Sequence, residues 1–208
     1  MVQVREVGLS DCRYNKQKAV KIAYHDKSGK ETGVRYRIAM EGDRFRWRKG
    51  SKTKLYGLWR LGNGTPPDFI VLCEGESDCH TLWFHDIPAL GLPGASNWNE
   101  ERDAHLFDGI PRIYVIIEPD KSGEAVEGWV SKSSIRDRIR IVNLGEHKDP
   151  SDLNLSDPEN FKARWGKALN ESIPWAKVKT PLQLEIDAIA KEGLDTIRLS
   201  ERLSSPQK

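Results

Sequence analysis

The sequence predicts an α/β fold in which a mostly parallel sheet carries helices on both faces, preceded by a small, basic, strand-rich subdomain. Two largely apolar runs, FIVLC at residues 69–73 and RIYVII at residues 112–117, have the length and composition of strands buried on both faces. Segments of helical length separate such runs, which is typical of a parallel sheet. The first 60 residues instead alternate short strand-like segments with turns.

Length and composition favour a water-soluble protein. The 208 residues suffice for one full domain and a smaller module, and the mean hydropathy is -0.62. No apolar run approaches the length of a membrane span, and the start, MVQVREVG, has no secretory apolar region, so we expect a cytoplasmic protein without membrane association. Cys12, Cys73 and Cys79 are odd in number and form no CxxC pair, which predicts reduced thiols.

The net charge of +2 conceals an uneven distribution along the chain. Residues 1–60 contain 16 Lys or Arg and 6 Asp or Glu, a balance of +10, whereas residues 61–208 contain 17 and 25, a balance of -8. A basic module joined to an acidic one predicts polyanion binding by the first and metal-ion binding by the second.

Basic and aromatic residues alternate in the predicted N-terminal strands. Residues 19–24 and 32–40 are predicted strands joined by a hairpin turn at 26–30, and residues 44–48 read RFRWR, with a cationic and an apolar face. Cationic groups suit phosphates, and exposed rings suit stacked bases at ~1 to 3 kcal/mol each. The alternative is a solvated sheet face whose aromatic rings are core. The candidate nucleic-acid or nucleotide contacts are Arg35, Arg37, Arg46, Arg48, Lys49, Lys52 and Lys54.

From residue 66 the pattern alternates strands and helices. After the strand at 69–73, Ser77 or Asp78 is expected to cap a helix. Further strands are predicted at residues 87–92, 112–117 and 138–144, and helices at residues 99–107, 123–132 and 158–169. A glycine-rich loop at residues 91–97 and an acidic loop at residues 147–152 complete the pattern.

Acidic residues follow three of the predicted strands. Glu74 ends one strand, Glu118 and Asp120 end another, and Asp149 and Asp152 follow a third. Parallel strands deliver their carboxyl ends to one edge of a sheet, so these side chains are expected to converge there. Carboxylates that close repel one another unless a cation lies among them, and hard oxygen ligands favour Mg²⁺.

The ordered motifs resemble those of the Toprim domain, which is shared by bacterial-type primases, type IA and type II topoisomerases and related nucleases. They are EGESD at residues 74–78, ALGLPGA at 89–95, EPDKSG at 118–123 and KDPSD at 148–152. The upstream KGSKTKLYGLWRL segment resembles the basic subdomain that precedes Toprim in bacterial-type, DnaG-like DNA primases. The resemblance implies a basic subdomain at residues 1–65, a Toprim catalytic domain at 66–175 and a helical tail or linker at 176–208.

The resemblance also implies roles for the acids. Glu74 becomes a metal ligand or general acid/base, Glu118 and Asp120 become the metal-binding pair, and Asp149 resembles the first acid of the downstream motif. Two departures stand out: the family usually has Asp where this chain has Glu118, and Ser151 stands where a second downstream Asp is common. We interpret Asp78 as a helix cap rather than a metal ligand.

The implied function is that of a DNA primase core, a nucleotidyltransferase that makes a short primer on single-stranded DNA from nucleoside triphosphates with Mg²⁺, or Mn²⁺ in its place. The chain has no GxxxxGK[ST] motif and no zinc ribbon, so a replicative helicase or a zinc-binding subunit is an expected partner, and a phage, plasmid or mobile element an expected source. The alternatives are a Toprim-type metal-dependent nuclease and a catalytically silent nucleic-acid-binding module.

Overall fold

The computed structural model describes residues 7–62, 64–117, 121–178 and 189. The chain divides into two units after Trp175. The described residues include no helix that is long and apolar enough to cross a membrane. The helical tail or linker predicted at residues 176–208 lies outside the described residues, apart from 176–178 and Ile189.

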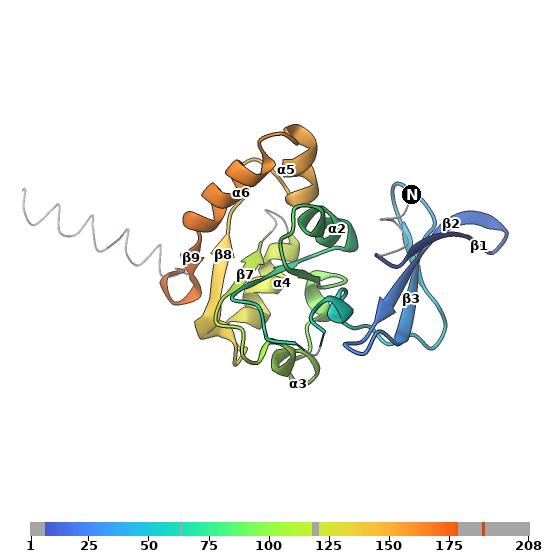
Figure 1. Ribbon diagram of the computed structural model, residues 1–208, viewed down its shortest axis with the longest axis horizontal. Helices are drawn as coiled ribbons and strands as arrows, with labels where there is room; N and C mark the ends of the chain where they lie inside the picture. Colours follow the sequence, from blue (N-terminus) through green and yellow to red (C-terminus); the bar gives the residue numbers. More distant parts are fainter. Residues whose placement is uncertain (1–6, 63, 118–120, 179–188, 190–208) are drawn as a thin grey trace, which may run out of the picture. The chain divides into compact units, whose positions relative to one another are not determined.

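The first sheet is antiparallel (Figure 1). It consists, in spatial order, of β1 Leu9–Tyr14, β2 Gln17–His25, β3 Glu31–Arg37 and β4 Phe45–Trp47. The β2–β3 turn is held by the Asp26 carboxylate, which accepts hydrogen bonds from the backbone N–H groups of Ser28 and Lys30 at 3.0 and 3.1 Å. The three predicted strands are confirmed, but β1 was missed because LSDCRY shows no alternation of apolar and polar residues.

The second sheet is parallel except for its last strand. Its order is β6-β5-β7-β8-β9, and only the β8–β9 pair is antiparallel. Every residue of the central strands β5 and β7 and of the edge strand β6 is buried, as expected for strands covered on both faces. The strands are β5 Ile70–Cys73, β6 Ala89–Gly91, β7 Ile113–Ile116, β8 Ile139–Val142 and β9 Ile173–Pro174. The predicted α/β class with a mostly parallel sheet is therefore confirmed.

Helices cover both faces of this sheet (Figure 1). Alternate strand residues such as Val71 pack with Leu82, Leu153 and Trp165 of α2, α5 and α6, while the intervening residues pack with Phe107 of η3 and with α4. The α-helices are α2 Glu76–Phe84, α3 Glu100–Asp103, α4 Lys121–Val130, α5 Pro150–Ser156 and α6 Phe161–Asn170. The 3-10 helices are η1 Leu58–Arg60, η2 Ala95–Asn97, η3 Ala104–Phe107, η4 Arg136–Arg138 and η5 Trp175–Lys177.

Two helix predictions need correction. The acidic loop predicted at residues 147–152 ends early, because Asp149 caps the short helix α5 and Pro150 occupies its first turn. At α2 the N-cap is Gly75, without a side-chain cap bond, so Ser77 and Asp78 lie inside the first turn instead of capping it.

An aromatic seam joins the two sheets. Tyr56 pairs with Gly91 at the free edge of β6, and its ring lies 5.0 Å from that of Tyr24 and 5.5 Å from that of Trp83. Gly91 permits this approach, since a Cβ there would lie 3.3 Å from Tyr56 Cβ and 3.0 Å from both Cys79 Sγ and the Gly75 carbonyl oxygen. Tyr56 is buried, so its ring is part of the core and cannot stack on a base.

Leu82 tests the apolar layer between α2 and the sheet. It is completely buried, so Leu82→Ala should lower the free energy of unfolding by about 2 to 5 kcal/mol in urea titrations. The control is Leu155→Ala on α5, because Leu155 is 78% exposed and its loss should change stability by less than about 0.5 kcal/mol. Equal effects of the two variants would contradict this packing.

His80 makes the stability of the seam depend on pH. The Tyr56 hydroxyl donates to the Val7 carbonyl at 2.6 Å and contacts His80 Nε2 at 2.8 Å. Burial lowers the pKa of His80 from 6.5 to about 4. The folded state then binds fewer protons than the unfolded state between these values, so stability is full above pH 6.5 and falls as the pH drops towards 4.

We expect His80→Gln to remove this contribution, on the order of 2 to 3 kcal/mol across the window. Urea unfolding at several pH values between 7.5 and 4.5 measures it as a flatter stability profile. His105→Gln serves as the control, because His105 is exposed and its replacement should leave the slope unchanged. An unchanged slope in His80→Gln would mean that this histidine does not carry the effect.

Candidate active site

Glu74 stands at the carboxyl end of β5, where the chain leaves the sheet. It follows the buried Cys73 directly, is itself half-buried, and has no hydrogen bond or ion pair with any described residue. Gly75 then turns the chain into α2, and a Cβ at Gly75 would lie 3.0 Å from Asp78 Oδ2. Glu74 therefore follows the sheet edge predicted for it, and its oxygens have no partner among the residues that the structure describes.

Asp149 is brought to the same edge by contacts between α2 and α5. Ser151 Oγ donates to Asp78 Oδ1 at 2.7 Å and lies 3.1 Å from Thr81 Oγ1. One Asp149 oxygen accepts the Asp152 backbone N–H at 2.8 Å as the cap of α5.

The charges of nearby acids affect the pKa of the Cys73 thiol. Its hydrogen bond with Cys79 and its burial raise its pKa well above the usual value, and the charges of Asp78 and Asp149 add to the rise. The charge of Asp149 therefore contributes to the electrostatic environment of the residue beside Glu74. Cys12, Cys73 and Cys79 are all free thiols, as predicted.

Asp152 and Ser151 are engaged elsewhere. The Asp152 carboxylate is exposed and lies 3.2 Å from both His147 Nδ1 and the Lys148 backbone N–H. Ser151, at the second position of the downstream motif, faces Asp78. The Asp152 carboxylate therefore bonds to residues of its own loop. It does not lie where Ser151 stands in place of the second acid of the motif.

The predicted metal-binding pair lies outside the described residues. In the sequence, Glu118 and Asp120 follow β7. This strand lies between β5 and β8 in the sheet and is hydrogen-bonded to both. Within the described part of the chain, no three His, Cys, Asp or Glu side chains form a group that could hold a metal ion. A metal site formed by Glu74, Glu118, Asp120 and Asp149 therefore stays a prediction.

A buried carboxylate two residues beyond Glu74 connects α2 to the first sheet. Glu76 is 4% exposed and accepts hydrogen bonds from the Tyr24 hydroxyl and from Arg35 Nη1, the latter at 3.0 Å. Arg35 also lies over the Phe45 ring, with its guanidinium carbon 4.0 Å from the ring centre. Burial and the Glu76 charge raise the pKa of Tyr24 well above 10, so both Tyr24 and Arg35 act as donors.

Sequence reasoning missed this cluster. It treated Arg35 as a phosphate contact, whereas the Arg35 side chain is 16% exposed and points to Glu76. The alternation of RFRWR places Phe45 and Trp47 on the same face as Arg35, because Arg35 is directly opposite Trp47 in the ladder. No local pattern pairs Tyr24 or Arg35 with a carboxylate 52 or 41 residues away.

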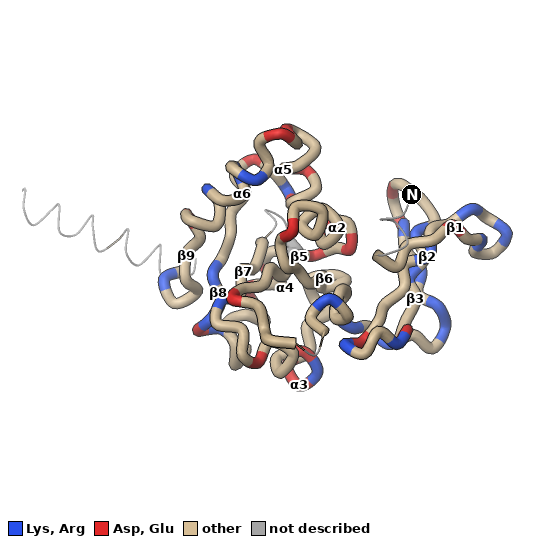
Figure 2. The backbone as a smooth tube through the Cα atoms, viewed as in Figure 1, with Lys and Arg blue, Asp and Glu red and all other residues tan. Residues whose placement is uncertain are grey.

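The other predicted basic contacts belong to the first sheet and the segment that follows it, where Figure 2 shows many Lys and Arg positions. Arg46 pairs with Asp43, and Arg48 pairs with Glu31 at 2.8 Å. Lys49 and Lys52 are exposed and have no ion pair within the described part of the chain. Acidic positions are prominent on α2 and α5 instead, so the charge asymmetry read from the sequence is also a separation in space.

Comparison with known proteins identifies the fold. No family model matches the chain. The gene 57 protein of Mycobacterium phage D29 is 27% identical over 124 residues, which cover 59% of this chain and 78% of that protein.

Solved structures give the more extensive match. A chain in the structure of the bacteriophage T7 lagging-strand DNA polymerase interacting with primase domains aligns over 84% of this chain and 88% of its own length, with a TM-score of 0.68 and 21% identity. The chain has the fold of a primase catalytic core. The bacteriophage T7 primase fragment (TM-score 0.64, 22% identity, 80% and 68% covered) and a Pseudomonas aeruginosa DNA primase domain (0.61, 21%, 84% and 60%) agree. The predicted resemblance to DnaG-like primase cores is confirmed for the fold.

The side chains of Arg35 and Glu76 should be energetically coupled, so that replacing either one lowers the free energy of unfolding. Both groups are mostly buried, so replacing one partner leaves the other charged and unpaired. We expect a double-mutant cycle of Arg35→Met and Glu76→Gln, measured by urea unfolding, to give a coupling energy of about 1 to 3 kcal/mol.

The matched control is the exposed pair Asp43 and Arg46, whose side chains are 80% and 38% exposed. Its cycle, Asp43→Asn with Arg46→Met, should give a coupling energy below about 1 kcal/mol. Additive effects of Arg35→Met and Glu76→Gln would show that the buried pair does not act as a unit.

Proposed function

We propose that this chain is the catalytic core of a DNA primase of the Toprim type, which makes a short primer on single-stranded DNA by template-directed nucleotidyl transfer. The observation that carries the proposal is the fold match, which spans 84% of the chain and so extends beyond either sheet alone. Glu74 at the carboxyl edge of the parallel sheet supports it, because ligands of open α/β sheets bind at that edge.

The donor set fits a hard divalent cation. Glu74 is partly exposed and unpaired among the described residues, and Asp149 uses one oxygen as a helix cap. Together with Glu118 and Asp120, which follow β7 in sequence, they would hold Mg²⁺ or Mn²⁺. Bound there, the ion would neutralise charge on the triphosphate and on the leaving pyrophosphate.

The chain's own residues have separate tasks in the reaction. The primer 3′-oxygen forms a bond to the α-phosphorus, the bond to the β-phosphate breaks, and the hydroxyl proton passes to a carboxylate such as Glu74. Cations of the first sheet and of the segment that follows it, the half-buried Arg37 and the exposed Arg48, Lys49 and Lys52, would neutralise phosphates of the template. The Arg35–Glu76 pair would fix the loop that carries Glu74.

The neighbours support the choice of partners. The T7 structure contains primase domains bound to an RNA/DNA hybrid and dTTP, and another structural neighbour, with a TM-score of 0.60, is a DnaG primase catalytic domain bound to single-stranded DNA. We extend both ligand classes to this chain. A helicase or a zinc-binding subunit as a further partner remains part of the proposal.

Primer synthesis on single-stranded DNA with Mg²⁺ or Mn²⁺ and labelled nucleotides tests the function. Glu74→Gln and Asp120→Asn each remove one negative charge at nearly constant volume, so each should reduce product formation by about a hundredfold or more. The control is Asp137→Asn, because Asp137 is 86% exposed and precedes β8, at the opposite edge of the sheet. Its activity should equal that of the unaltered chain.

The same assay separates the alternatives. Cleavage of the DNA without synthesis would contradict a primase and favour a metal-dependent nuclease. Tight DNA binding with neither activity would favour a catalytically silent module, for which Glu118 in place of the family's usual Asp is the supporting feature.

A further inference from the structure

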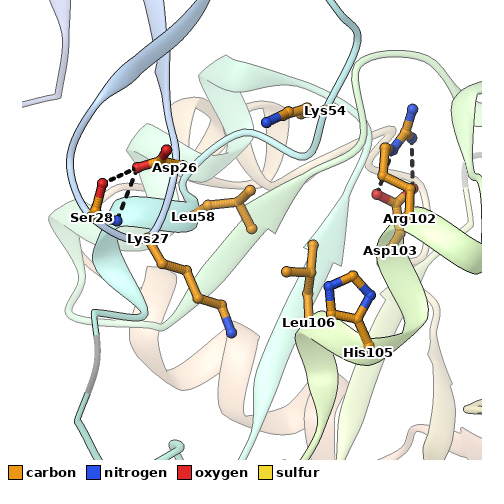
Figure 3. Close-up of a pocket in the computed structure, with 9 residues that line it drawn as sticks. All are labelled: Asp26, Lys27, Ser28, Lys54, Leu58, Arg102, Asp103, His105 and Leu106. Carbon is orange, nitrogen blue, oxygen red and sulfur yellow. Dashed lines mark hydrogen bonds and ion pairs between the residues drawn. The ribbon is translucent and has the colours of Figure 1, made fainter.

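A cavity of about 460 Å³ lies away from the candidate active site, between the β2–β3 turn and the α3–η3 segment (Figure 3). None of its lining residues belongs to the loops that follow β5 or β8. The residues that line it are Asp26, Lys27, Ser28, Lys54, Leu58, Arg102, Asp103, His105 and Leu106. Its volume is in the range of small-molecule sites.

The acids of this cavity are already engaged. Asp26 Oδ1 accepts three hydrogen bonds from its own turn, from Ser28 N, Ser28 Oγ and Lys30 N. Asp103 is completely buried and paired with Arg102 at 2.6 Å. These carboxylates therefore have little capacity left to bind a cation.

The lysines of the cavity are not engaged in this way. Lys27 and Lys54 have no hydrogen bond or ion pair within the described part of the chain, and their ammonium groups lie on the cavity in Figure 3. Arg102 and Asp103 neutralise each other, so two ammonium groups face the single charge of Asp26. The cavity favours an anion such as a phosphate.

The floor between these cations is apolar. Leu58 is 4% exposed, and Leu106 and the His105 ring come from the segment on the other side of the cavity (Figure 3). An aliphatic surface beside an imidazole ring suits the flat face of a nucleobase. Arg102 links the segments around the cavity. Its guanidinium donates to the carbonyl oxygens of Thr53 at 2.8 Å and Asn97 at 2.7 Å.

We propose that this cavity is a second nucleotide site, which binds a nucleotide phosphate on Lys27, with Lys54 adding positive charge on the other side of Leu58, and its base against Leu58, Leu106 and His105 without a divalent metal. The chemistry is the same for a free nucleoside triphosphate and for one nucleotide of a single strand. Only the choice between these sources rests on the proposed primase function.

The test is equilibrium binding of fluorescently labelled ATP to the full chain at low salt in EDTA. Binding should persist in EDTA and in Glu74→Gln, because the cavity uses no metal and no residue of the catalytic edge. Lys27→Ala and Leu106→Ser should each weaken binding about tenfold, and Lys27→Ala should also reduce its salt dependence. Lys167→Ala on α6, whose ammonium is exposed and 3.9 Å from Glu171, should have no effect.

Competition distinguishes the sources of the nucleotide. Displacement by unlabelled ATP but not by a short oligothymidylate supports a free nucleotide, and displacement by the oligonucleotide supports a strand. Inorganic tripolyphosphate competing as well as ATP would refute the base contact and overturn the proposal. So would undetectable binding in EDTA, loss of binding in Glu74→Gln, or wild-type affinity in both cavity variants. None of these outcomes depends on primer synthesis, so the two proposals fail separately.

Discussion

The arrangement of the two sheets depends most on the hydrogen bonds that the buried Glu76 carboxylate accepts. This carboxylate accepts hydrogen bonds from Tyr24 of β2 and Arg35 of β3 while it lies in the first turn of α2. A buried ion pair adds little net stability over an apolar contact of the same size, but it has few alternative geometries. The pair therefore specifies where the first sheet sits on α2, and the aromatic seam around Tyr56 adds the apolar burial.

This arrangement also divides the cations of the first sheet into two groups. Arg35 is used inside the protein, where Glu76 and the Phe45 ring occupy its guanidinium, although its Nε has no hydrogen-bond partner among the described residues. Lys49 and Lys52 are exposed and have no ion pair with another described residue, so their ammonium groups can contact a ligand. A count of Lys and Arg alone overstates the cationic surface, because position in the ladder decides which side chains face inward.

Local signals explain what the sequence could predict. The buried strands β5 and β7 were predictable because a short apolar run needs no partner to be recognised, and their carboxyl ends locate Glu74. The helix α5 was missed although Asp149 and Pro150 form a recognisable helix start, because the acids there were assigned to a metal-binding loop. Contacts such as Tyr24 with Glu76 depend on packing between distant segments, and no single-sequence pattern encodes them.

One short segment connects the candidate active site with the cavity. Lys54 and Leu58 line the cavity, while Tyr56 between them pairs with Gly91 and contacts His80 of α2. Gly91 in turn is packed against the Gly75 carbonyl oxygen, one residue from Glu74. The backbone of this segment cannot shift without disturbing the start of α2, since interiors are close-packed and transmit strain. The geometry of the cavity and that of the catalytic edge are therefore set by the same contacts around Tyr56.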